Sequence, residues 1–319
     1  MIITCNKQTS GNLCALVTIN IAVSVGLVCA SKYVYAIWPY PLAAVTVQQI
    51  ITWVCLYNDK HNERVIASWY IGIMFAISIA GTNVLLQHVS VGLYELVKAL
   101  AVPALVMVQY KQYKVQEGKH GILVCAGIVL FMAVGTVHTS IQTDNFIAVV
   151  VGIIAVVASA THKASIKACS KQHEIAPEIL LAAQMPSTCV CLAIATLALE
   201  APSRPSWEIS LAIIAIALAG VIMNVTAVKI INATPMLYQN LGPVKSLTLV
   251  AVSNSWGDAW QATCIVGAAA CGAMYTQVKN TSWDNAPIRC LLYMDNIPVS
   301  YTHLRAHETR EDRGWRRVR

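Results

Sequence analysis

The sequence contains a succession of apolar segments close to the length of about 20 residues that an α-helix needs to cross a bilayer. Backbone polar groups find no water in the hydrocarbon core, so such segments form helices there. The composition agrees, because 57% of the residues are hydrophobic and 12% are charged, against about 25% charged in soluble proteins. The sequence therefore predicts an all-α polytopic membrane protein whose partner is the lipid bilayer.

Ten spanning segments follow from this pattern, five on each side of a polar break at residues 138–145. The predicted spans are 13–33, 41–57, 67–87, 89–110, 120–137, 146–165, 178–199, 209–231, 237–254 and 260–278. Two halves with an odd number of spans insert with opposite orientation, as in inverted-repeat transporters. We therefore expect one five-helix half at residues 1–140 and an inverted second half at 141–280. Residues 281–319 are polar and are expected to form a disordered cytosolic tail or to be a non-native end.

The basic residues of the connections gather on the side that holds the N-terminus. They are Lys7, Lys60, Arg64, Lys111, Lys114, Lys119, Lys163, Lys167, Lys171 and Lys279. By the positive-inside rule, both termini are expected in the cytosol. Membrane topology thereby explains the formal charge of +7, and no nucleic-acid partner is expected. The lysines at 163–171 are interpreted as surface charges of a cytosolic loop.

The span around residues 90–108, SVGLYELVKALAVPALVMV, carries charged side chains near its middle. A lysine at the centre of a spanning helix costs about 2.5–3.5 kcal/mol on insertion scales, so it usually faces a cavity or a partner. Tyr94, Glu95 and Lys98 occupy neighbouring positions on one helix face. The structural alternative is that Glu95 and Lys98 simply neutralise each other within the helix.

A second lysine, Lys245, lies near the middle of the ninth span, in the stretch MLYQNLGPVKSLTLVAV. Tyr238 precedes it by two helical turns on the same face, and Gln239 and Asn240 add hydrogen-bonding groups beside it. Pro243 lacks a backbone N–H and is expected to kink this helix, which would expose main-chain groups to a ligand.

Two intramembrane lysines against one carboxylate predict a positive, water-filled cavity at the middle of the bilayer. Such a cavity suits a phosphate, pyrophosphate or carboxylate, each of which accepts several hydrogen bonds from lysine and tyrosine. Gln184 in the seventh span is a weaker candidate, because helix-to-helix hydrogen bonding explains it slightly better. The predicted substrate-binding residues are Lys98, Lys245, Tyr94, Tyr238, Gln239, Asn240, Gln184 and Glu95.

Motifs of enzymes are missing from the sequence. It contains no P-loop, no GxSxG, no HExxH and no paired aspartates of an intramembrane protease. The eleven cysteines show no CxxC spacing and mostly lie in apolar segments, where they are expected to act as small buried apolar side chains. We therefore expect no enzymatic activity, no cofactor and no metal site.

Four stretches resemble the triose-phosphate translocator and nucleotide-sugar transporter family of the drug/metabolite transporter superfamily. They read SKYVYAIWPYPLAAVTVQQ, NVLLQHVSVGLYELVKALAVP, LLAAQMPSTC and NVTAVKIINATPMLYQNLGPVKS. The resemblance implies a ten-helix fold of two inverted halves that exchanges sugar phosphates or nucleotide sugars. It also implies that Lys98 and Lys245 hold the substrate phosphate, with Tyr94 and Tyr238 contributing nearby.

The sequence departs from the family pattern at two positions beside these lysines. Plastid members follow the second lysine with arginine, where this chain has Ser246, and Glu95 stands where glutamine is common. No plastid transit peptide is evident, so the resemblance implies a carrier of the Golgi or the endoplasmic reticulum. The FYNN and GALNK motifs of GDP-mannose carriers are not intact.

We therefore expect a secondary antiporter for a phosphorylated sugar, namely a nucleotide sugar exchanged for a nucleoside monophosphate. Two alternatives stay open at this point. One is a plastid-type exchanger of sugar phosphate and inorganic phosphate, and the other is a membrane scaffold or receptor that transports nothing. The oligomeric state is also open, a homodimer included.

Overall fold

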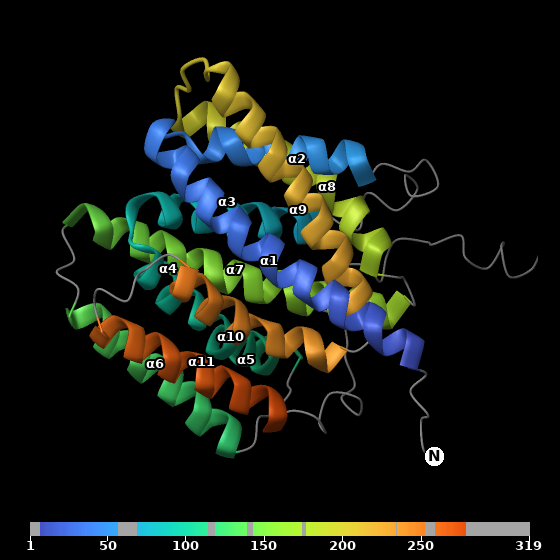
Figure 1. Cartoon of the computed structure of the whole chain (residues 1–319), viewed down its shortest axis with the longest axis vertical. Coiled ribbons are helices and arrows are strands. Elements are labelled where there is room, and N and C mark those ends of the chain that lie inside the picture. The colour runs from blue at the N-terminus through green and yellow to red at the C-terminus, as the bar shows by residue number, and fades with distance from the viewer. Residues whose placement is uncertain are drawn as a thin grey trace, which may run out of the picture. The chain divides into compact units, whose positions relative to one another are not determined.

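Apolar helices make up most of the chain that the structure describes. The computed structural model describes residues 7–56, 69–113, 119–138, 143–173, 177–233, 235–252 and 259–278, and no strand occurs among these residues. The helices are α1 (Lys7–Ile37), α2 (Pro41–Leu56), α3 (Trp69–His88), α4 (Val91–Ala99), α5 (Ala101–Tyr113), α6 (Lys119–His138), α7 (Thr143–His173), α8 (Pro177–Leu199), α9 (Trp207–Ala233), α10 (Pro235–Val252) and α11 (Ala259–Val278) (Figure 1). All of them belong to one unit, Met1–Arg289. The predicted tail at 281–319 lies outside the described residues.

Six segments of these helices are long and apolar enough to cross a membrane. They are Ala15–Ile37, Trp69–His88, Val91–Lys111, Phe146–Ile166, Ile179–Leu199 and Trp207–Ala227, and shorter apolar helices lie at Pro41–Leu56, Gly121–Gly135 and Ala262–Gly272. Large apolar side chains such as Leu123, Ile194 and Leu197 are exposed, which suits contact with lipid tails. The prediction of an all-α polytopic membrane protein is confirmed at this level.

The fourth predicted span is a single helix in the sequence analysis but two helices in the structure. α4 and α5 lie on either side of Leu100, whose N–H donates to the Val97 carbonyl at 3.1 Å in a tightened last turn. Pro103 explains the break, because proline has no N–H to donate to the Ala99 carbonyl and its ring collides with that oxygen. Lys98 therefore lies at the end of a helix in the interior of a span.

α7 is longer than the sequence analysis predicts. The predicted span stops at residue 165, whereas α7 runs to His173. No glycine or proline lies between residues 153 and 176, so the usual signals that stop a helix are missing there. The longer helix adds Lys167 and Lys171 to α7, whereas Lys163 lies inside both the predicted span 146–165 and the candidate span Phe146–Ile166. Lys163 belongs to a helix, so its assignment to a loop is wrong.

Two charged side chains stabilise helix ends that would otherwise carry unpaired backbone groups. The Lys32 ammonium of α1 donates to three main-chain carbonyl oxygens at the end of α3, at 2.6, 3.0 and 2.8 Å. The Glu200 carboxylate accepts from the backbone N–H groups of Leu42 and Ala43, at the start of α2, at 2.9 Å each. Both charges oppose the partial charge of the helix end that they contact. Lys32 thus has a structural role.

Helices from the two predicted halves pack against each other. The most extensive contacts join α3 with α7, α6 with α11, α1 with α9 and α2 with α8. Figure 1 shows α1 beside α9, and α6 beside α11. A glycine permits one of these approaches, since a Cβ on Gly81 of α3 would lie 2.6 Å from Ala155 Cβ and 3.1 Å from the Val151 carbonyl oxygen of α7. Small residues commonly allow membrane helices to pack in this way.

Replacing Gly81 with alanine is expected to lower the thermal stability of the purified protein. The Ala155 Cβ is fixed to the backbone and cannot rotate away, so α3 and α7 must separate, at a cost of about 1–3 kcal/mol. Gly26→Ala in α1 is the matched control, because its added Cβ meets no heavy atom within 4 Å and alanine favours a helix by about 1 kcal/mol over glycine. Thermal unfolding in detergent compares the two variants, and equal melting temperatures would contradict the packing described here.

Candidate functional site between α4, α7 and α10

Three lysines from three different helices lie close enough for their charges to interact. Lys98 comes from α4, Lys163 from α7 and Lys245 from α10. The charge of Lys98 interacts with that of Lys163, and the charge of Lys245 interacts with both. Lys98 and Lys245, which the sequence analysis placed in one site, are therefore near each other, and Lys163 joins them.

Lys98 is partly accessible to water although it belongs to a spanning segment. The residues before it, from Gly92 to Val97, are buried, whereas 41% of the Lys98 side chain is exposed. Its charge interacts with lysines of α7 and α10. Its Nζ lies 4.8 Å from the centre of the Tyr94 ring, a cation–π contact that helps to hold the ammonium in place.

Glu95 connects α4 to α10. Its side chain is 2% exposed, and its Oε1 accepts a hydrogen bond from Lys98 Nζ at 3.3 Å. Its Oε2 accepts from the hydroxyl of Ser246, the residue after Lys245. A buried carboxylate is costly unless hydrogen bonds and an opposite charge compensate for the lost water, and these two donors provide both. The Glu95–Lys98 pair of the structural alternative therefore forms.

That pair does not neutralise the site. Three lysine charges and one carboxylate interact in this cluster among the residues that the structure describes, which gives the described cluster a net positive charge. Groups of three or more metal-binding side chains are absent from the residues that the structure describes. The arrangement can hold an anion, and nothing in these ranges resembles a metal centre.

Lys163 is positioned by its neighbour in the sequence. The His162 ring stacks on Phe75 of α3 with centroids 4.6 Å apart, and its Nε2 lies 2.8 Å from Gln184 Oε1 of α8. Successive side chains of an α-helix point in directions about 100° apart. The Lys163 side chain therefore points away from the surface where His162 packs against α3 and α8. Lys163 was not predicted as a site residue because it was grouped with Lys167 and Lys171 as a surface charge, although the predicted span 146–165 already includes it.

Gln184 lies in this packed surface and not in the accessible part of the site. It is fully buried and bonds to His162, while its side-chain nitrogen has no hydrogen-bond partner within the described residues. With no exposed surface, Gln184 cannot touch a ligand in this conformation. Its contact is the helix-to-helix hydrogen bond that the sequence analysis slightly preferred.

The remaining predicted residues belong to the first turns of α10. Tyr238, Gln239 and Asn240 lie in this helix before Lys245, but their side chains lie outside the described part of the structure. α10 is helical from Pro235 to Val252 without a break, so Pro243 does not interrupt it.

Comparison with known proteins gives little beyond this geometry. No family model matches the chain. A solved structure described as "Crystal structure of protein" is similar over 84% of this chain and 98% of that chain, with 15% sequence identity and a TM-score of 0.48. At these values the similarity carries no argument about the site.

Proposed function

We propose that the protein is a secondary antiporter that exchanges a phosphorylated sugar across a Golgi or endoplasmic reticulum membrane by alternating access. The substrate pair is a nucleotide sugar and a nucleoside monophosphate, as in the transporter family that the sequence resembles. The observation that carries the proposal is the net positive cluster of Lys98, Lys163 and Lys245 within the helical unit. Phosphate groups suit it, because charge-assisted hydrogen bonds from lysine are among the strongest that proteins make.

The charges also supply a reason for exchange. A carrier that changes its open side must pass through a closed state in which its site is poorly hydrated. Closing around a net positive cluster is costly, because the charges lose water and one carboxylate does not balance three lysines. A bound phosphate supplies that counter-charge. Return of the loaded carrier is thereby favoured over return of the empty one.

Packing between the helices supports a fold of ten spans in two inverted repeats. This scheme pairs each helix of the first half with one of the second: α1 with α7, α2 with α8, α3 with α9, the broken helix α4–α5 with α10, and α6 with α11. Exchanging the halves turns the α1–α9 contact into α7–α3, and the α2–α9 contact into α8–α3, and all four are present. The α2–α8 and α6–α11 contacts map onto themselves. A two-fold relation between the halves accounts for this pattern.

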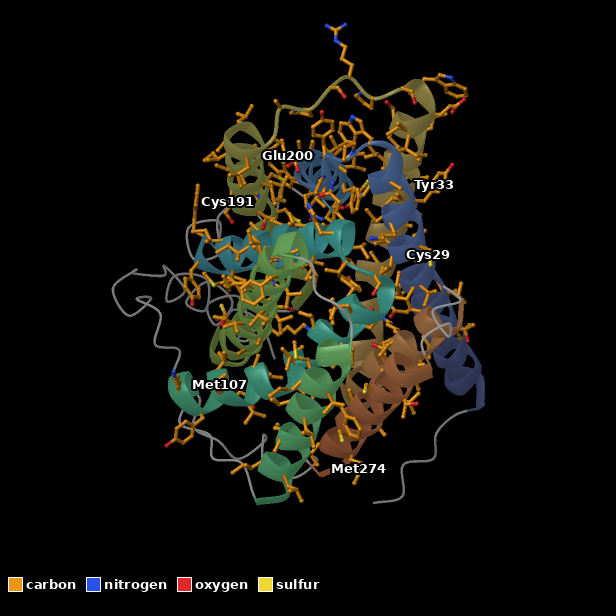
Figure 2. All side chains as sticks on the ribbon, turned by 90° about the vertical axis from the view of Figure 1, so that its left-hand side faces the viewer. Cys29, Tyr33, Met107, Cys191, Glu200 and Met274 are labelled. Carbon is orange, nitrogen blue, oxygen red and sulfur yellow. The ribbon has the colours of Figure 1, made fainter. Side chains whose placement is uncertain are left out.

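The arrangement of helix ends supports the proposed topology with both termini in the cytosol. Figure 2 shows Glu200 at one end of the unit, and Met107 and Met274 toward the other. Met107 lies near the C-terminal end of α5, which carries Lys111 in its last turn, and Met274 lies near the end of α11. A basic residue at this end agrees with a cytosolic face.

Ligand-induced stabilisation tests the proposal. Purified protein is expected to melt at a higher temperature with its nucleotide sugar or nucleoside monophosphate, because a ligand at 100 times its Kd stabilises by about 2.7 kcal/mol. The screen compares nucleotide sugars, sugar phosphates and nucleoside monophosphates with neutral nucleosides and sugars. A scaffold or receptor in which the lysines are structural would show no shift with any anion.

A plastid-type exchanger is the second candidate, and the third lysine is compatible with it. Three lysine charges in one cluster suit a compact, highly charged sugar phosphate as well as a nucleotide sugar. Counter-substrates separate the two candidates. In proteoliposomes loaded with inorganic phosphate, the plastid-type exchanger takes up sugar phosphate, whereas the nucleotide-sugar carrier needs a nucleoside monophosphate inside.

A further inference from the structure

We propose that Glu95 is an internal counter-ion, which occupies Lys98 when substrate is absent and thereby limits how tightly the site binds anions. The inference rests on the proposed function, since it assigns a role within the same site. It concerns a residue that no step of phosphate binding requires, because a carboxylate repels a phosphate.

The geometry places the carboxylate where a phosphate oxygen would otherwise bind. Lys98 has three N–H donors, and its ammonium lies against the Tyr94 ring on one side and Glu95 Oε1 on another. The Nζ–Oε1 distance of 3.3 Å exceeds the optimum of about 2.7–2.9 Å for a charge-assisted hydrogen bond. A partner held at this distance is weakly bound and can be displaced by a phosphate oxygen.

Ser246 gives the displaced carboxylate a second anchor. Its hydroxyl donates to Glu95 Oε2, which leaves Oε1 as the oxygen on Lys98. The carboxylate can therefore give up Lys98 to a phosphate and keep one hydrogen bond. Because Ser246 follows Lys245 in α10, this anchor also keeps the negative charge close to the other lysine that the substrate would contact.

The functional consequence is a moderate affinity. Glu95 cancels one of three positive charges, which weakens anion binding and favours release on the far side of the membrane. It also reduces the repulsion within the empty site. Removing its charge should therefore strengthen binding of anions and slow their release.

The variant Glu95→Gln tests this, because glutamine keeps the shape and an oxygen that accepts from Ser246 but loses the charge. The probe is inorganic pyrophosphate, which carries negative charge without a base or sugar, and binding is read as stabilisation of the purified protein. The Kd is expected to fall about fivefold, the equivalent of about 1 kcal/mol for a partly exposed ion pair. Tightening should be smaller for acetate, which carries one charge, and absent for glucose. Glu208→Gln is the matched control, since Glu208 is exposed in the first turn of α9, and its Kd should equal that of the wild type.

The outcomes separate the inference from the proposed function. If the wild type is stabilised by pyrophosphate or nucleotides but Glu95→Gln binds them equally or more weakly, Glu95 is only a structural tie and the inference fails alone. If no anion stabilises the wild type, the proposed function fails and the inference fails with it. Should Glu95→Gln not fold, Glu95→Asp keeps the charge but shortens the side chain by one methylene, drawing the carboxylate away from Lys98. A smaller tightening is then expected, and none would overturn the inference.

Discussion

Replacing Lys245 with alanine is expected to abolish exchange of nucleotide sugar for nucleoside monophosphate in proteoliposomes, while the protein stays folded. The variant removes one of the charges that interact in the cluster. Truncating one partner of a desolvated charge pair costs about 2–5 kcal/mol, which is a loss of about thirtyfold or more in affinity. Stabilisation by the nucleotide should disappear together with exchange.

The controls separate loss of the site from loss of the fold. Lys111→Ala removes the same charge from an exposed position in the last turn of α5, and it should leave exchange unchanged. Lys245→Arg keeps the charge with a different shape, and it should retain part of the activity. The melting temperature of Lys245→Ala without ligand should stay near that of the wild type. Unaltered exchange by this variant would refute the proposed site.

Hydropathy alone predicts the class of fold, because the bilayer imposes its thickness on every span. The predicted spans at 41–57, 67–87 and 178–199 agree with α2, α3 and α8 to within a few residues. The interruption at Leu100 was not predicted, although Pro103 was visible. Proline removes a backbone hydrogen bond of the preceding turn, so the helix breaks before the proline. Spanning segments tolerate such breaks where neighbouring helices bond to the freed backbone groups.

The site was predicted only as far as single helices allow. Lys98 and Lys245 were found because a charge in an apolar segment is conspicuous by itself. The bond between Glu95 and Ser246, which are 151 residues apart, depends on how two helices are rotated about their axes, and no local pattern encodes that. The two positions had been noted separately as departures from the family pattern.

Lys32 and Lys163 show that the role of a lysine cannot be read from its position in the sequence alone. Lys32 lies near the end of a predicted span, where its side chain was expected to reach the membrane interface, but it bonds to three backbone carbonyls at the end of α3. Lys163 looks like an ordinary topological charge, but it lies in α7 and interacts with the other two lysines. A lysine's role depends on what its long side chain reaches, and that is a property of the packed helices.

Replacing Lys163 with alanine is expected to weaken binding of pyrophosphate and nucleotide sugar by about tenfold, or about 1.4 kcal/mol. Lys163 is exposed, whereas Lys245 is partly buried. Loss of Lys163 should therefore cost less binding energy than loss of Lys245. Its charge acts on both other lysines, which places it on the α7 side of any anion that those two hold. A ligand with two phosphate groups can contact all three lysines, whereas a single phosphate is satisfied by two.

Ligands with one and with two phosphate groups test whether Lys163 contacts the second phosphate. Stabilisation by pyrophosphate and by inorganic phosphate is measured for Lys163→Ala, Lys163→Arg and the wild type. If Lys163 binds the second phosphate, alanine reduces the pyrophosphate affinity more than the phosphate affinity, and arginine restores most of it. An equal loss for both ligands would mean that Lys163 acts only through its general charge. If neither affinity changes, Lys163 is a topological charge after all, and the site has the two lysines that the sequence alone suggests.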